Sequence, residues 1–243
     1  MPEGALVTGG GSGIGLACAR LLSELGHQVA LVGRDREKLE AAATECPGAL
    51  ALQADVASRE EVAAAVRRAV EAFGGLDVAV VSAGVFPSRE RLDEVSDSSW
   101  RDTLAINLDG AFHTLAEVVP HLRERGGYVF AIGSIYANGG LRLGAPYAAS
   151  KAGLAGLVHT LIQEWEEHQV RATLISPGVV RTGMVGDGRR DDHGLLSPDD
   201  VAHAVRFCLG LSGAALVREI VLERAEVARN DRDVQEDPAR WSS

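Results

Sequence analysis

Apolar residues follow two alternating patterns along the chain: short continuous runs, and longer stretches in which they recur every three to four positions. The runs predict strands buried on both faces, and the longer stretches predict amphipathic helices. The predicted strands cover residues 4–8, 28–33, 49–54, 77–82, 128–133, 170–176 and 215–223. The predicted helices cover residues 13–25, 35–45, 58–73, 96–124, 145–168 and 198–209.

The regular alternation of strand and helix predicts an α/β fold. Strands that are apolar on both faces belong to a parallel sheet, and right-handed crossovers cover both of its sides. We therefore expect a doubly wound, Rossmann-type parallel sheet of about seven strands with helices on both faces. No linker interrupts residues 1–224, which are predicted to form one domain, followed by a polar tail over 225–243. The Gly-, Arg- and Asp-rich stretch 183–196 is predicted to be a loop over the site.

Helix boundaries carry local signals. Ser58 followed by Glu61 predicts a capping box, and Ser197-Pro198 predicts an N-cap with proline at the first helical position. Pro120 is expected to kink or end the helix over 96–124, because proline cannot donate the helical hydrogen bond.

The composition excludes several classes of protein. The chain has 243 residues, 46% of them apolar, so it is not expected to be disordered. Its 34 acidic residues against 24 basic ones give a net charge of −10, which argues against a nucleic-acid partner. The apolar runs are far shorter than the ~20 residues of a membrane span, and no secretion signal is recognisable, so no membrane partner is expected.

Cysteine and histidine usage points to a reducing compartment and away from metal. Cys18, Cys46 and Cys208 are widely spaced, form no C-x-x-C pair and are predicted to be reduced thiols in a cytoplasmic protein. The seven histidines show no metal-ligand spacing, so no metal is predicted.

Lysine is scarce in this chain. Only Lys38 and Lys151 are lysines, against 22 arginines. A preference for arginine codons would be sufficient to explain the bias, but the scarcity makes the position of each lysine informative.

A glycine-rich segment joins the first predicted strand to the first predicted helix. Such a turn lets the backbone approach a pyrophosphate, whose charge the helix N-terminus favours; the alternative is a merely flexible turn. The segment runs Thr8-Gly-Gly-Gly-Ser-Gly-Ile-Gly15, a T-G-x(3)-G-x-G pattern rather than G-x-G-x-x-G. It resembles the cofactor loop of the short-chain dehydrogenase/reductase family, in its branch of about 250-residue chains. The candidate phosphate-binding residues are Gly9, Ser12, Gly13, Ile14 and Gly15.

Tyr147 and Lys151 are four residues apart on a predicted helix and so share one face. Tyrosine alone is a poor acid or base at neutral pH, because its reference pKa is about 10. A nearby ammonium is expected to lower that pKa, which makes the pair a candidate general acid/base. The alternative is a surface tyrosine beside a surface lysine.

Two further residues complete a constellation similar to the family's catalytic set. Ser134 ends a predicted strand 13 residues before Tyr147, and a hydroxyl there can hydrogen-bond a substrate oxygen. Asn107 stands in an N-x-x-G segment of the long helix. The resemblance implies that Asn107 holds a water of a proton relay and that Lys151 also binds the nicotinamide ribose. Arginine could not easily replace this lysine, because its geometry and hydration differ.

The end of the second strand bears on the choice of dinucleotide. The position at which NAD-binding family members carry an acid is Gly33 here, and Arg34 follows, placed to accept a 2′-phosphate. Asp35 is the alternative candidate, as a ribose ligand. Family members also commonly carry a basic residue just before the glycine that is Gly13 here, but this chain has Ser12 at that position. We therefore expect NADP(H), with NAD(H) as the alternative cofactor.

Other segments resemble further cofactor contacts of the family. Asp55-Val56 resembles its adenine contact, and Ser82-Ala83-Gly84 resembles its N-A-G motif with serine in place of asparagine. The segment 177–182 resembles its P-G-x-x-x-T, which implies nicotinamide contacts. Its candidate residues are Pro177, Gly178, Val180 and Thr182. The resemblance covers residues 4–182 well.

Together these features imply an NADP(H)-dependent oxidoreductase that transfers a hydride between nicotinamide and a carbonyl or secondary alcohol. One alternative is a 3-oxoacyl-(acyl-carrier-protein)-type reductase, for which Arg123 and Arg125 could dock an acidic carrier, although Glu166-Glu167 opposes this. The other is a non-catalytic dinucleotide-binding regulator, against which the intact catalytic set argues. The resemblance also implies a homodimer or homotetramer formed through the helices 96–124 and 145–168.

Overall fold

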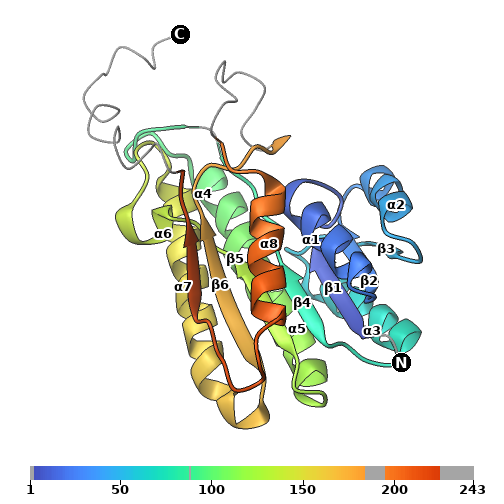
Figure 1. The fold of residues 1–243 in the computed structure, drawn as a ribbon. Coiled ribbons are helices and arrows are strands. Elements are labelled where there is room, and N and C mark those ends of the chain that lie inside the picture. The colour runs from blue at the N-terminus through green and yellow to red at the C-terminus, as the bar shows by residue number, and fades with distance from the viewer. Residues whose placement is uncertain (1–2, 88, 184–194, 225–243) are drawn as a thin grey trace.

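Seven parallel strands form one sheet in the order β3-β2-β1-β4-β5-β6-β7 (Figure 1). The computed structural model describes residues 3–87, 89–183 and 195–224; the predicted tail over 225–243 and most of the predicted loop over 183–196 lie outside them. The strands are β1 (Gly4–Thr8), β2 (Gln28–Gly33), β3 (Leu50–Gln53), β4 (Val78–Val81), β5 (Tyr128–Ile132), β6 (Arg171–Pro177) and β7 (Glu219–Leu222). The predicted doubly wound sheet is confirmed.

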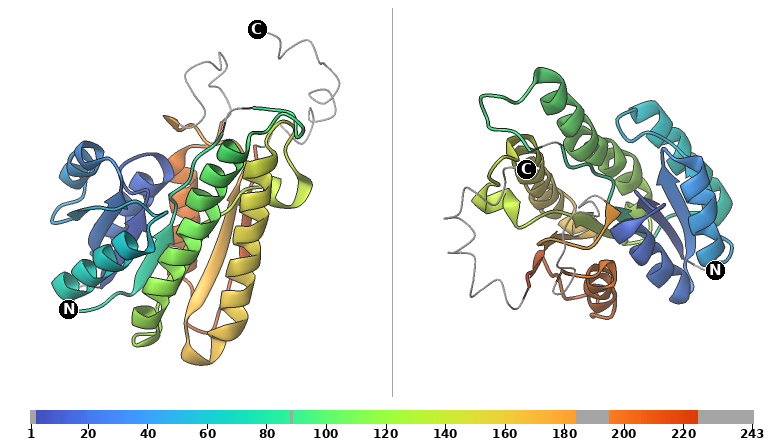
Figure 2. Two further views of the ribbon diagram at one scale, coloured as in Figure 1. Left: turned by 180° about the vertical axis from the view of Figure 1, so that it is seen from behind. Right: turned by 90° about the horizontal axis from the view of Figure 1, so that it is seen from above.

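Helices cover both faces of this sheet. α1 (Gly13–Glu24), α2 (Arg36–Glu45) and α8 (Pro198–Leu209) pack on one face. α3 (Arg59–Phe73), α5 (Gly110–Arg123) and α7 (Ala145–Glu164) pack on the other, where Figure 2 shows α5 in green beside α7 in yellow. α4 (Asp97–Leu104), the π-helical segment η1 (Ala105–Asp109), the short α6 (Tyr136–Gly139) and the 3-10 turn η2 (Glu166–His168) complete the described elements.

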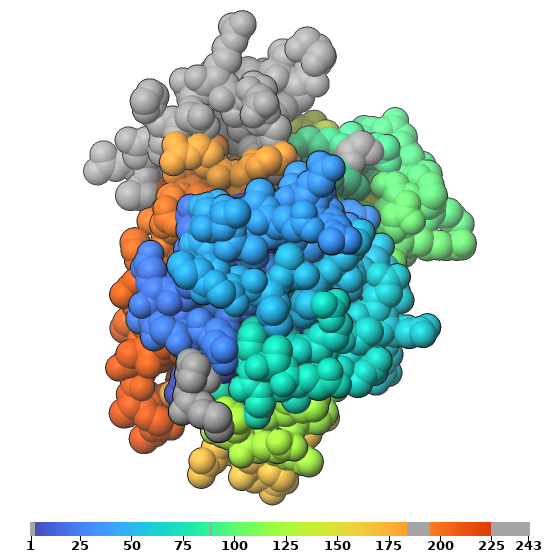
Figure 3. All heavy atoms as spheres, turned by 90° about the vertical axis from the view of Figure 1, so that its right-hand side faces the viewer, coloured from blue at the N-terminus to red at the C-terminus, as the bar shows by residue number. Residues whose placement is uncertain are grey.

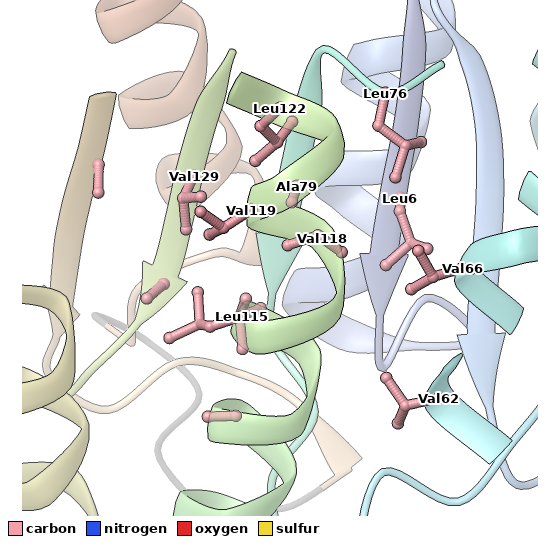
Figure 4. Packing of buried hydrophobic residues seen from close by; sticks show 14 of the residues in the cluster. Leu6, Val62, Val66, Leu76, Ala79, Leu115, Val118, Val119, Leu122 and Val129 are labelled. Carbon is pink, nitrogen blue, oxygen red and sulfur yellow. The ribbon is translucent and has the colours of Figure 1, made fainter. Parts of the chain in front are cut away.

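The core lies in two layers, one on each face of the sheet. Figure 4 shows the layer beneath α3 and α5, in which Leu6, Val66, Leu115, Val118 and Val129 meet. At one edge of the sheet the side chains of α2, β3 and α3 form the molecular surface (Figure 3, residues in blue to cyan). Since parallel strands are buried on both faces, their carboxyl ends are the accessible part of the sheet.

Several predicted boundaries differ from the observed ones. β7 begins at Glu219 rather than 215, and the helix predicted over 145–168 ends at Glu164, with the 3-10 turn η2 after Trp165. Pro120 does not end the helix, since α5 continues to Arg123. Pro120 falls in the last turn, so only one late hydrogen bond is lost.

The capping predictions are confirmed in part. Ser197 and Asp200 form a complete capping box at α8. At α3, Ser58 accepts a hydrogen bond from the Glu61 amide, but the Glu61 carboxylate accepts from Asp55 N (2.8 Å) instead of Ser58 N. The Ser58 N–H already donates to Asp55 O, so Glu61 serves the neighbouring turn.

The three cysteines are unpaired and buried. Burial raises the pKa of Cys18 to about 12, which keeps this thiol protonated and unreactive. Among the described residues, no helix is long and apolar enough to cross a membrane.

Candidate active site

The site lies where the strand order reverses, between β1 and β4. A side chain on Gly9 would come within 3.1 Å of the Ala83 backbone, so the loops after these two strands touch. Thr8 holds them together, because its hydroxyl accepts from Ser82 N (3.1 Å) and Ala83 N (3.3 Å). Ligands of open α/β sheets bind in this crevice.

The α1 N-terminus is open toward the crevice. Its N-cap residue, Ser12, makes no side-chain cap hydrogen bond, and the first turn holds no acid. By contrast, α2, α3, α4 and α8 each have a side-chain cap and an acid in the first turn. Unpaired amides at a helix start favour an anion, so this end fits a phosphate group.

Gly13 and Gly15 show why this loop requires glycine. Gly13 has a φ of +52°, which L side chains rarely adopt, and a side chain on it would meet Thr182 Cγ2 at 3.1 Å. A Cβ on Gly15 would clash with Gly9 O. The loop is therefore folded tightly enough to bring backbone amides to a ligand, and the segment after β6 lies across it.

A cleft of about 1140 Å³ runs from this loop along the carboxyl ends of the strands. The structure brings most of the predicted site residues together in its wall. They are Gly9, Ser12, Gly13, Ile14, Gly15, Arg34, Ser82, Ala83, Gly84, Ser134, Tyr147, Lys151, Pro177, Gly178, Val180 and Thr182. Asn107, Asp55 and Val56 are not among the described lining residues.

Asp55 and Val56 make their described contacts elsewhere. Val56 packs so closely on Gly110 that a Cβ there would approach its Cγ2 to 2.6 Å. The glycine of the predicted N-x-x-G segment is thus needed for helix packing. Asp55 accepts from Ala57 N (3.0 Å), as expected of a turn residue.

Tyr147 lies on the first turns of α7, close to the Ser134 hydroxyl. Burial raises the pKa of Tyr147, while its hydrogen bond with Ser134 lowers it and Tyr136 raises it. The sequence predicts a lowered pKa caused by Lys151, and the structure differs on this point. The Lys151 Nζ lies over the face of the Tyr147 ring, 5.8 Å from its centroid.

Lys151 is buried, with 5% of its surface exposed. Its Nζ donates to Ile132 O (2.8 Å), and burial lowers its pKa to about 8. At neutral pH the ammonium is therefore the main form. A Cβ on Gly84 would lie 3.8 Å from Nζ, so the amine lies beside the loop after β4 in the wall of the cleft.

Asn107 is buried behind the cleft, in the π-helical segment between α4 and α5. Its Oδ1 accepts from Val85 N (2.7 Å), and its Nδ2 donates to Val85 O (2.9 Å) and Ser150 Oγ (3.1 Å). The Ser150 hydroxyl in turn donates to Tyr147 O (2.7 Å). The side chain therefore ties the loop after β4 to the helix that carries Tyr147, and π segments often mark such functional places.

The charged side chains in the described lining of the cleft are positive, whereas the chain as a whole is negatively charged. Its described lining contains four cations, Arg34, Lys38, Arg89 and Lys151, and no carboxylate, although the chain has a net charge of −10. Both lysines of the chain thus line one cleft. Lys38 is absent from the residues predicted from the sequence; the scarcity of lysine was the signal that could have found it.

Lys38 lies against the glycine loop, since a Cβ on Gly11 would approach its Cβ to 3.3 Å. Its Nζ pairs with Asp35 (3.2 Å), whose carboxylate also caps α2 by accepting from Lys38 N (3.1 Å). Asp35 is therefore engaged as a helix cap.

Three other wall residues have no counterpart in the sequence predictions. Phe86 contacts the Tyr147 ring, with centroids 5.0 Å apart, and the Arg89 guanidinium lies over Phe86 at 5.6 Å. Tyr136, on α6, lies near enough to Tyr147 to affect its pKa. None belongs to a motif, so only the fold places them here.

Among the described residues, no group of His, Cys, Asp or Glu side chains could hold a metal ion.

A doubly wound parallel sheet with a glycine loop at its switch point defines a dinucleotide-binding α/β protein. The comparisons with known proteins narrow this class. The short chain dehydrogenase family matches residues 3–193. An uncharacterized oxidoreductase of Staphylococcus aureus (strain MW2) is 34% identical over 221 residues, which cover 90% of this chain and 95% of that protein.

Solved structures agree. An alcohol dehydrogenase from the archaeon Thermococcus sibiricus, complexed with 5-hydroxy-NADP, has a TM-score of 0.84 and 31% identity, covering 91% of this chain and 96% of that one. A short chain dehydrogenase from Burkholderia cenocepacia J2315 in complex with NADP has the same TM-score and coverage, with 32% identity. The chain belongs to the short-chain dehydrogenase family of oxidoreductases, which bind a nicotinamide dinucleotide.

Proposed function

We propose that this protein is an NADP(H)-dependent oxidoreductase that interconverts a carbonyl compound and a secondary alcohol. The observation that carries the proposal is the convergence of Ser134, Tyr147 and Lys151 on the wall of the cleft that contains the glycine loop. A phosphate-binding loop and a proton donor in one cleft are what such a reaction requires.

The bound nicotinamide would supply or accept the hydride at the substrate carbon. In the direction of reduction, Ser134 donates a hydrogen bond to the substrate oxygen and Tyr147 donates the proton that completes the alcohol. The raised pKa of Tyr147 keeps the phenol protonated before the reaction, but it also makes the phenol a weaker acid, so proton transfer requires stabilisation of the phenolate. The Lys151 ammonium over the ring then stabilises the phenolate that is left.

Asn107 supports this arrangement from outside the cleft. Its side chain is committed to Val85 and Ser150. It therefore acts as a positioning group for the Tyr147 helix.

Three observations favour NADP(H) over NAD(H). Arg34 and Lys38 provide two cations at the end of β2, where a 2′-phosphate would lie. Asp35, the alternative ribose ligand, is engaged as the cap of α2. The cleft as described has no carboxylate to repel a third phosphate.

The alternative of a reductase for acyl-carrier-protein substrates has less support. Its two candidate docking arginines are engaged: Arg123 lies over the Trp165 ring (5.8 Å), and Arg125 bonds Gly74 O (2.6 Å) and Asp77 (3.3 Å).

We further propose a cytoplasmic homodimer or homotetramer formed through α5 and α7. There Phe112 is 45% exposed and a Cβ on Gly156 would meet nothing within 4 Å. Sedimentation of the purified chain measures this state.

The reaction is tested by Tyr147→Phe. Loss of the phenol should lower kcat by about 10²- to 10⁴-fold while leaving the Kd for NADPH unchanged, because general acid catalysis contributes that much. Tyr128→Phe is the matched control: its hydroxyl bonds Thr173 within the fold and lies outside the cleft lining, so activity should persist. Near-normal turnover by Tyr147→Phe would refute the mechanism.

The cofactor is tested by Arg34→Asp. Removing a charge-assisted hydrogen bond, worth about 1.5–3 kcal/mol, should raise the KM for NADPH at least about 10-fold and shift preference toward NADH. Arg36→Asp makes the same charge change two residues on, where the side chain pairs with Glu40 (2.7 Å) outside the cleft lining. An equal loss in both variants would mean that net charge alone is responsible.

A further inference from the structure

We propose that the substrate end of the cleft selects carbonyl compounds that carry an aromatic ring, either neutral or anionic. The proposal rests on the proposed function, and it names the substrate class of the same site. It follows from the residues of the cleft wall that serve neither the phosphate loop nor proton transfer: Phe86, Pro87, Tyr136 and Leu141.

These residues form an apolar wall around the proton donor. Phe86 contacts the Tyr147 ring at a tilt of 53°, and Tyr136 is close enough to influence the Tyr147 pKa. Phe86 and Tyr136 therefore add two rings to the lining of the cleft that contains the proton donor. Aromatic side chains prefer tilted or offset contact with another ring, so a ring attached to the substrate finds favourable partners here.

The wall is built before any substrate arrives. Asn107 fixes Val85, the residue before Phe86, through two hydrogen bonds to its backbone. The Arg89 guanidinium lies over the Phe86 ring, 5.6 Å from its centroid. Preformed walls bind a rigid ring without the cost of ordering loops.

A second contact joins the two loops that carry the wall. Glu90 N donates to Leu143 O (3.2 Å), which links the loop after β4 to the connection between α6 and α7. Leu143 has a φ of +59°, rare for a bulky residue. Leu141 packs on Gly144, where a Cβ would approach its side chain to 2.6 Å. The strained turn thus holds Leu141 at the wall, and such strain persists where the surrounding structure requires it.

The chemistry of the wall disfavours other substrate classes. The only side-chain hydroxyls at this end of the described lining are Ser134, Tyr136 and Tyr147. A sugar would need many matched polar partners, since each buried hydroxyl left unpaired costs affinity. A substrate with an ammonium group would meet no carboxylate in the described lining.

The test compares two ketones of equal carbonyl reactivity, 4-phenylbutan-2-one and 4-cyclohexylbutan-2-one. Two methylene groups separate the ring from the carbonyl in each, so the pair differs only in the ring, which is planar and aromatic in one ketone and puckered and saturated in the other. We expect the ratio of kcat/KM, phenyl over cyclohexyl, to be about 3 to 10 in the wild-type enzyme with NADPH.

Three variants test which side chains produce the preference for the phenyl ketone. Phe86→Leu and Tyr136→Leu each replace a ring by a smaller apolar side chain, so each should bring the ratio closer to 1. Phe207→Leu is the matched control, because Phe207 is 57% exposed on α8 and outside the cleft lining. Its ratio should equal that of the wild type.

The outcomes separate this proposal from the proposed function. Equal rates for the two ketones, a preference for the cyclohexyl ketone, or faster turnover of sugars than of both would overturn the substrate class and leave the reductase intact. A wild-type ratio that Phe86→Leu and Tyr136→Leu do not change would also overturn it. Failure to reduce any carbonyl compound with NADPH or NADH would refute the proposed function itself.

Discussion

Replacing Asn107 by leucine tests whether its side chain is a structural clamp. The amide is buried and makes three hydrogen bonds, two to the Val85 backbone and one to Ser150 Oγ. Leucine has a similar shape but can make none of them. At about 1 kcal/mol net for each bond, the variant should lose about 3 kcal/mol of unfolding free energy. A protein of this size should then melt about 6–12 °C lower.

The same change should lower activity, since Val85 lies between Gly84 and Phe86 on the cleft wall. Displacement of catalytic groups by about 1 Å can cost on the order of 100-fold in rate. Urea denaturation measures the stability, and NADPH oxidation with a ketone measures kcat and KM. Ser150→Ala keeps both Val85 bonds but removes the bonds of Ser150 to Asn107 and Tyr147 O, so it should lose about 2 kcal/mol.

Thr103→Val is the matched control. Thr103 is also buried, but its hydroxyl donates only to Ser99 O (2.7 Å) within α4. We expect a loss of about 1 kcal/mol with full activity. If Asn107→Leu were no less stable than Thr103→Val, or retained wild-type kcat/KM, the clamp would be refuted.

Two further predictions concern charge and packing. Because burial lowers the pKa of Lys151 from 10.5 to about 8, the unfolded chain holds a proton between these pH values that the folded chain has lost. The unfolding free energy of the wild type, relative to Lys151→Met, should therefore rise from pH 8 toward 10.5, as urea denaturation at each pH measures; a flat difference would contradict the burial. Gly110→Ala should cost about 1–3 kcal/mol, because its Cβ would meet Val56 Cγ2 at 2.6 Å. Gly210→Ala, with its nearest contact at 3.5 Å, should be neutral or stabilising by up to about 1 kcal/mol, and the reverse order in thermal melts would contradict the packing argument.

The fold was predictable because its signals are local. A strand buried on both faces or a helix with one apolar stripe is specified by its own ten or so residues, and the right-handed crossover rule then leaves few topologies. Boundaries were less predictable where tertiary contacts intervene. β7 is shorter than its apolar run, and Glu61 serves Asp55 rather than its own helix.

The candidate site divides in the same way. The glycine loop and the Tyr147–Lys151 pair are contiguous or share one helix face, so their spacing alone identifies them. Lys38, Phe86 and Tyr136 belong to no motif and reach the cleft from three different segments. Their membership depends on how α2 packs against the glycine loop and how the loops after β4 and β5 approach one another.

The residue pattern was sufficient for the fold class and the family, and it proposed the catalytic residues, because these depend on short-range periodicity and spacing. The pKa values of those residues could not be predicted from the sequence pattern. Lys151 has a pKa of about 8 and Tyr147 a raised one because the surrounding elements remove them from water. Desolvation is set by every segment packed around a group, so it exists only once the chain has folded.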